Sequence, residues 1–120
     1  MKKTILISSI MAIIALTGCD KKPLPDDLVT TNIKGWERGG FDTVIIADFE
    51  IVNKTDKPIK DITIECDGYS ETKTRIDRNK RVIYKNIPAN GKITVKKFNM
   101  GYVGSAVNSL GCITTKFENL

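Results

Sequence analysis

The sequence predicts an all-β fold, a β-sandwich of about six or seven short strands, with a small closed β-barrel as the alternative. Apolar and polar residues alternate with a period of two in several segments, as they do in strands with one buried face. Turn-favouring residues separate these segments at spacings of about 8 to 12 residues, which is typical of sandwiches and barrels. No segment after residue 18 sustains the helical period of about 3.6 residues.

The clearest alternation lies between residues 43 and 53. Its apolar set, expected to face the core, comprises Ile45, Ala47, Phe49 and Ile51. A turn is predicted from Asn53 to Pro58, because this segment is rich in turn-forming residues. The next strand, predicted over 59–67, places Ile62, Ile64 and Cys66 on one face, so Cys66 is expected to point toward the core.

The segment after residue 70 is predicted as a hairpin. Residues 71–77 and 81–87 would form its two arms, and residues 78–80 its tight turn. Its arms carry many basic side chains.

Residues 92–98 are predicted as a further strand that contains a bulge. Phe98 is out of phase with the apolar positions before it, which places the bulge near Lys96 or Lys97. Residues 99–111 contain three glycines and no clean period, so they are predicted as a loop. The last strand is expected to start at Cys112.

The N-terminal segment 1–18 has the three parts of a secretory signal: two lysines, an apolar stretch and small residues at its end. The apolar stretch is shorter than the roughly 20 residues that a transmembrane helix needs. Residues 19–31 contain prolines and many charges, which predicts a solvated tether. The β-sandwich domain is therefore predicted over residues 32–120, with Trp36 in its core or at the rim of that core.

A cysteine stands directly after the signal, in the order Leu16-Thr17-Gly18-Cys19. This order resembles the bacterial lipobox, which implies that Cys19 becomes the first mature residue and carries diacylglycerol on its thiol. Two or more acyl chains hold a protein firmly, because each buried methylene contributes about 0.8 kcal/mol. By resemblance to enterobacterial lipoproteins, Asp20 indicates the inner membrane, facing the periplasm, with the outer membrane as the alternative. An ordinary secretory signal with a chance cysteine is the other interpretation.

The two remaining cysteines, Cys66 and Cys112, form an even pair in an exported chain. Disulfides persist in oxidising compartments, so a Cys66–Cys112 disulfide is predicted, with two reduced buried thiols as the alternative. Such a bond would tie two sheets or two neighbouring strands together.

The composition excludes several kinds of chemistry. Histidine is absent, which removes Ser-His-Asp and Cys-His nucleophile systems and the commonest metal ligand. Cys66 and Cys112 form no C-x-x-C motif. Glu65 and Asp67 alternate onto an exposed strand face, the usual position of solvated carboxylates. We therefore expect a protein that is not an enzyme and that uses no cofactor and no metal.

Opposite charges occupy separate parts of the chain. Residues 42–71 contain eight acidic and three basic residues, whereas residues 72–97 contain nine basic residues and one acidic residue. Neighbouring strands that pair across the solvent face would explain this pattern. The alternative is a basic patch for anionic lipid, a cell-wall polymer or an acidic protein, made of Lys73, Arg75, Arg78, Lys80, Arg81 and Lys85. Without the signal's two lysines the formal net charge falls from +5 to +3, so no nucleic-acid partner is expected.

Part of the chain resembles the FxLYD-type and related small immunoglobulin-like domains of exported bacterial proteins. The resemblance covers residues 44–104: a strand ending in Asn53, a turn with Pro58, an aromatic at Tyr69, and a turn-then-strand unit over 88–98. The literal Phe-x-Leu-Tyr-Asp string is missing. The resemblance implies an immunoglobulin-like β-sandwich and brings no catalytic residues.

These features together predict a membrane-anchored binding or scaffolding module of the cell envelope. Its expected partners are the membrane, through the lipid on Cys19, and an unidentified envelope protein or anionic polymer. The alternative is an inhibitor of a cell-wall enzyme such as lysozyme, since membrane-bound lysozyme inhibitors are also small, disulfide-bonded β lipoproteins. The serine-glycine-aromatic signature expected of those inhibitors is not seen.

Overall fold

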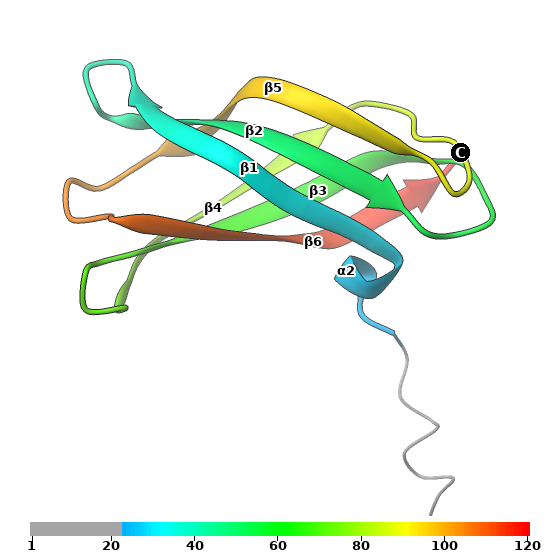
Figure 1. The fold of residues 1–120 in the computed structure, drawn as a ribbon, viewed down its shortest axis with the longest axis horizontal. Coiled ribbons are helices and arrows are strands. Elements are labelled where there is room, and N and C mark those ends of the chain that lie inside the picture. Colours follow the sequence, from blue (N-terminus) through cyan, green and yellow to red (C-terminus); the bar gives the residue numbers. More distant parts are fainter. Residues whose placement is uncertain (1–22) are drawn as a thin grey trace, which may run out of the picture.

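The computed structural model describes residues 23–120, which form two antiparallel three-stranded sheets (Figure 1). Sheet A has the strand order β1 (Val29–Gly39), β2 (Val44–Asn53), β5 (Lys92–Tyr102). Sheet B has the order β4 (Arg75–Ile83), β3 (Ile59–Tyr69), β6 (Ser109–Asn119). A short helix, α2 (Pro25–Leu28), precedes β1. The described sheets pack as a sandwich without closing, so the predicted fold class is confirmed and the barrel alternative is wrong.

The inner faces of the two central strands form the core. The predicted inward set of β2 is buried at all four positions, Ile45, Ala47, Phe49 and Ile51. From β3, Ile62, Ile64 and Cys66 are fully buried, which confirms that Cys66 points inward. The ring of Phe49 meets the ring of Phe98 on β5 edge-on, with centroids 6.3 Å apart. Because these residues lie at alternate positions, each central strand contributes one apolar face to the same interior.

A buried asparagine organises the turn between β2 and β3, in the predicted position. The Asn53 side chain is fully buried, and its Nδ2 donates to the carbonyls of Lys57 (2.8 Å) and Pro88 (3.0 Å). Its Oδ1 accepts a hydrogen bond from the Thr55 amide at 2.9 Å. One side chain thus fixes this turn and ties it to the connection between β4 and β5.

The predicted bulge in β5 is confirmed. Ala47 pairs with Phe98 and Phe49 pairs with Val95, so β5 has one residue more than β2 over this interval. Lys97 lies in the bulge with a positive φ of 52°, and its amide donates to Asp48 Oδ1 at 2.8 Å. The bulge brings Phe98 back to the inner face.

The predicted hairpin over residues 71–87 is wrong. β4 runs without interruption from Arg75 to Ile83, and the expected turn at 78–80 lies in its middle. β3 is eleven residues long, and it provides a ladder partner for each of residues 78–80. An uninterrupted β4 pairs that whole side of β3, whereas a hairpin would leave half of it open. The chain instead reverses at residues 70–74, where the Ser70 amide donates to the Thr74 carbonyl at 2.8 Å.

The predicted loop over residues 99–111 is shorter than expected. β5 continues to Tyr102 and β6 starts at Ser109, so only residues 103–108 connect them and Cys112 lies inside β6. Gly101 belongs to β5 with a φ of 107°, and a Cβ there would come within 2.5 Å of Arg81 Nη2. The glycine therefore serves the close approach of β4, and it does not mark a loop.

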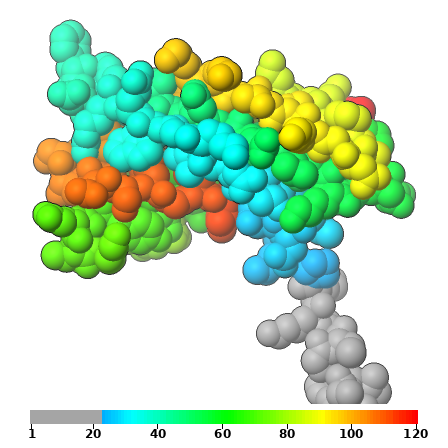
Figure 2. Space-filling view, in the orientation of Figure 1, coloured from blue at the N-terminus to red at the C-terminus, as the bar shows by residue number. Residues whose placement is uncertain are grey.

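The folded domain begins earlier than the predicted boundary at residue 32. Asp26 of α2 contacts both sheets: its Oδ1 accepts hydrogen bonds from the amides of Thr31 on β1 (3.3 Å) and Thr114 on β6 (2.9 Å). The hydroxyls of Thr31 and Thr114 share a buried hydrogen bond of 2.6 Å. β1 and β6 lie side by side above α2 in Figure 2. Residues 25–31 therefore belong to the domain, while the predicted signal, Cys19 and Asp20 lie outside the described residues.

Candidate functional site

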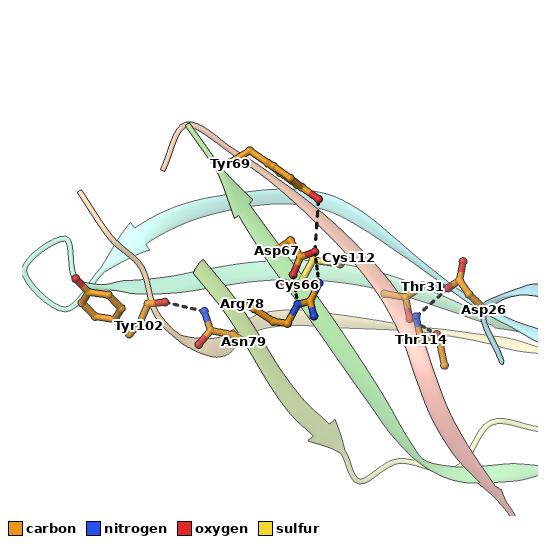
Figure 3. The surroundings of a disulfide bond; sticks show 10 residues. All are labelled: Asp26, Thr31, Cys66, Asp67, Tyr69, Arg78, Asn79, Tyr102, Cys112 and Thr114. Carbon is orange, nitrogen blue, oxygen red and sulfur yellow. Dashed lines mark hydrogen bonds and ion pairs between the residues drawn. A yellow bond between two sulfur atoms is a disulfide. The ribbon is translucent and has the colours of Figure 1, made fainter. Parts of the chain in front are cut away.

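Cys66 and Cys112 are directly paired across β3 and β6 and form a disulfide, with their Cα atoms 4.1 Å apart (Figure 3). The predicted bond is confirmed, and it joins neighbouring strands of sheet B rather than the two sheets. It links residues 46 positions apart in sequence. The strands that carry the charged outer face of sheet B are thus tied covalently.

The six residues of the possible basic patch do not gather in one place. Three of them lie along β4, facing the outer side of sheet B: Arg75, Arg78 and Lys80. Lys73 lies in the β3–β4 connection, and Lys85 follows the end of β4. Arg81 pairs with the inward-facing Ile64, so its side chain leaves the sheet on the inner side. The structure therefore places three of the six residues in a row along one strand and separates the other three.

Acidic side chains of β3 neutralise part of this row. Asp67 accepts hydrogen bonds from Arg78 Nε (2.8 Å) and Nη2 (3.2 Å), and this pairing lowers the pKa of Asp67 below its ordinary value. Tyr69 donates its hydroxyl to the same carboxylate at 3.5 Å. Glu65 Oε2 lies 3.7 Å from Arg78 Nε and 4.0 Å from Lys80 Nζ. These contacts support the interpretation that the two charge blocks pair across neighbouring strands.

The inner side of β4 carries polar residues that hold β4 against the β5–β6 connection. Asp77 Oδ2 accepts a hydrogen bond from the Gly104 amide at 2.6 Å. Asn79 Nδ2 donates to the Tyr102 carbonyl at 2.7 Å, as Figure 3 shows. We call these two contacts the β4 latch. The latch closes the open side of the sandwich with hydrogen bonds in place of apolar packing.

A shallow groove crosses the other half of the outer face of sheet B. Its floor is Thr63 on the central strand, between its ladder neighbours Val82 on β4 and Lys116 on β6. Tyr84, whose side chain is 77% exposed, also lines it. The remaining charged lining residues are the lysines Lys60 and Lys80 and the carboxylates Asp61 and Glu118. Arg81 borders the groove, but its guanidinium extends to the inner side, toward Gly101 of β5. Three lysines and two carboxylates thus surround this groove.

Sequence reasoning missed most of the groove. Alternation places Lys80, Val82 and Tyr84 on one face of an extended strand, but the predicted turn at 78–80 broke this pattern. Lys116 comes opposite Thr63 only because the register between β3 and β6 shifts just before Thr63. No local sequence signal predicts that shift.

Two other aromatic residues lie away from the groove. Trp36 is half-buried and packs against the core, as predicted, with the guanidinium carbon of Arg38 6.0 Å from its ring centroid. Phe41, in the turn between β1 and β2, is fully exposed and has a positive φ of 63°.

Within residues 23–120, the His, Cys, Asp and Glu side chains form no group of three or more that is placed to hold a metal ion. Among the same residues, no helix is long and apolar enough to cross a membrane.

Comparison of the chain with models of protein families, with curated proteins and with solved structures gave no match.

Proposed function

We propose that this chain is a lipid-anchored protein of the bacterial envelope whose β-sandwich is a non-enzymatic binding or scaffolding module. The observation that carries the proposal is the outer face of sheet B. Exposed cations and the exposed ring of Tyr84 stand there beside β3 and β6, the two strands that a disulfide ties together. Exposed charge and aromatic groups on a rigid sheet are a suitable surface for a partner.

The position of α2 gives the proposed anchor a short reach. α2 begins at Pro25, six residues after Cys19, and a chain of that length spans at most about 22 Å. The hydrogen bonds of Asp26 hold α2 against both sheets, so the residues of α2 do not add to the length of the tether. A lipid on Cys19 then keeps the domain close to the bilayer, the inner membrane by the argument from Asp20 and the outer membrane as the alternative. The partner, an envelope protein or an anionic polymer, must be within reach of that surface.

The strand order supports the immunoglobulin-like assignment. Sheet A, β1-β2-β5, corresponds to strands A-B-E of that fold, and sheet B, β6-β3-β4, corresponds to F-C-C′. The disulfide differs, because it joins the strands equivalent to C and F where antibody domains join B and F.

The anchor is tested with Cys19→Ser. Because the thiol is the proposed acceptor, this variant is expected to lose the acyl mass and to leave the membrane fraction. Mass spectrometry of the mature protein and cell fractionation measure the two effects. Cys112→Ser, which removes a cysteine of the folded domain instead, is the control and should remain acylated. A wild-type protein that keeps Met1 or an unmodified Cys19 contradicts the proposal.

The binding role is tested by crosslinking in intact cells, followed by purification of the chain. A reproducible crosslinked envelope component is expected, and its absence under several crosslinkers contradicts the proposal. A lysozyme assay with the purified protein tests the inhibitor alternative. Stoichiometric inhibition in that assay would replace the scaffolding role with inhibition.

A further inference from the structure

We propose that the groove on the outer face of sheet B binds an acidic polysaccharide, a sugar chain that carries carboxylate or phosphate groups. The inference deepens the proposed function. It rests on that function for one point, that the ligand comes from the cell envelope. The site itself rests on the residues that line the groove.

The shape of the groove suits a chain. Thr63 and its neighbour Val82 have short side chains of similar size, and they lie beside the longer Lys116 on the other flanking strand. The depression continues on one side past Lys80 and Thr115 and on the other past Lys60 and Glu118. It follows the direction of the strands and is open to solvent along its length. An extended polymer fills such a surface better than a compact small molecule, which prefers an enclosed pocket.

The charge of the groove suits an anion. Lys116 is 69% exposed and lies 3.4 Å from Glu118, and Lys80 is 59% exposed and lies 4.0 Å from Glu65. Exposed pairs of this kind are weak, so a ligand anion can compete for both ammonium groups. Lys60 adds a third lysine, whereas Asp61 is the one other carboxylate in the lining. The balance around the groove is therefore positive and complements a chain with repeated negative charges.

The uncharged lining residues favour a sugar over other anions. Tyr84 presents an exposed aromatic ring, which offers an apolar face and a hydroxyl to a sugar ring. The hydroxyls of Thr63 and Thr115 line the same groove and can exchange hydrogen bonds with sugar hydroxyls. A phospholipid surface would meet mainly the cations, and an acidic peptide such as polyglutamate has no ring to pack on Tyr84. Dependence on Tyr84 is therefore the property that separates the sugar chain from these occupants.

The decisive experiment compares two double variants with equal charge. Residues 23–120 contain every described strand, the disulfide and the core, so this domain is used for calorimetric titration with oligogalacturonate and with phosphorylated mannan fragments. Lys80→Gln with Lys116→Gln is expected to weaken binding about tenfold or more. The control, Lys34→Gln with Lys92→Gln on sheet A, changes the same charge at lysines with closely matched exposure and ion-pair distances. The control is expected to retain binding within about twofold, since the groove is intact.

A second pair of variants tests the aromatic contribution. Tyr84→Ala is expected to weaken binding by about 3- to 10-fold, the usual worth of one aromatic contact. Tyr102→Ala removes an aromatic ring of similar exposure at the other end of the domain and should have no effect. Thermal unfolding of all variants checks that each one is folded.

Four outcomes overturn the inference. They are no binding of either sugar chain, equal losses in the two lysine variants, tighter binding to polyglutamate than to either sugar chain, and binding only to phosphatidylglycerol vesicles. If sugar binding fails in one of these ways while the protein in cells is acylated and crosslinks to an envelope component, the proposed function still holds. Loss of the anchor and of the crosslinks, with sugar binding retained, refutes the proposed function alone.

Discussion

Sheet A and sheet B have the same number of strands and the same antiparallel pairing, but different interactions hold them together. In sheet A, β2 is buried at every second residue, and its outward-facing, partly buried Glu50 lies between Lys34 (3.8 Å) and Lys92 (3.5 Å). In sheet B, the central strand is covalently tied to β6. Its edge strand β4 is held by the β4 latch, which is the pair of hydrogen bonds made by Asp77 and Asn79. The Asp67–Arg78 pair holds it as well.

The difference shows how one small domain distributes its stabilising contacts between two sheets. Sheet A relies on apolar burial, which a local alternation of residues encodes. Sheet B contributes Ile62, Ile64 and Ile83 to the same core and adds specific contacts between residues distant in sequence. Examples are the bonds of Cys66 with Cys112 and of Asp77 with Gly104. The Asp67–Arg78 pair occupies one half of its outer face, and the lysines beside Thr63 remain exposed on the other half.

The largest expected effect is in sheet A. Phe49→Ala removes a fully buried ring that packs against Phe98, and it should lower the free energy of unfolding by about 3 to 5 kcal/mol. Urea unfolding followed by tryptophan fluorescence measures the change. Phe41→Ala is the matched control, because that ring is fully exposed, and its effect should stay within about 0.5 kcal/mol. Similar losses in both variants would contradict the role of Phe49 as a central side chain of the core.

The next effect concerns the disulfide that joins β3 and β6 of sheet B. Replacing both Cys66 and Cys112 by alanine should lower the free energy of unfolding by about 2 to 4 kcal/mol, since the disulfide restricts the unfolded chain. Reduction of the parent protein with dithiothreitol should reproduce most of this loss. An unfolding midpoint that does not move on reduction would show that the ladder between β3 and β6 is sufficient without the bond.

A smaller effect is expected from the β4 latch. Asp77→Ala leaves the amide of the buried Gly104 without its acceptor, which should cost about 1 to 3 kcal/mol. Asp48→Ala removes the same kind of contact in sheet A, the hydrogen bond to the Lys97 amide. That bond is exposed, and water can replace the carboxylate there, so the loss should be smaller. Thermal unfolding of the two variants side by side decides whether the two sheets differ in this way.

The same division explains which features the sequence predicts. The inward set of β2, the phase of Cys66, the bulge beside Phe98 and the disulfide all follow from local alternation or from counting cysteines. The uninterrupted β4 does not. Arg78, Asn79 and Lys80 resemble a polar turn until their partners on β3 and β5 are known. The early start at α2 was missed for the same reason, because Asp26 is stabilised by Thr114, 88 residues away.

The candidate site was only partly predictable. The basic character of the segment after residue 72 is visible in the sequence, and its pairing with acidic β3 was one of the two interpretations. The groove depends on which residues flank Thr63, and this is set by ladder register on both of its sides. Register follows from the packing of the whole sheet, so a pattern within one strand cannot specify it.

The smallest expected effect is a pH dependence of the free energy of unfolding, and it arises from one ion pair in sheet B. Arg78 holds the pKa of Asp67 below its ordinary value, so the folded state binds the Asp67 proton less readily than the unfolded chain does. The stability that this pair contributes is therefore complete above the ordinary pKa of 3.8 and is lost as the pH falls through the lower pKa of the folded state. Asp67→Asn should be slightly less stable than the parent near neutral pH, and the two proteins should converge in acid. Arg78→Gln should show the same convergence, because it removes the other half of the pair, and the double variant should add little. Urea midpoints measured from pH 6 downward test this, and a constant gap between parent and Asp67→Asn across the acid range would mean that the pair does not stabilise sheet B.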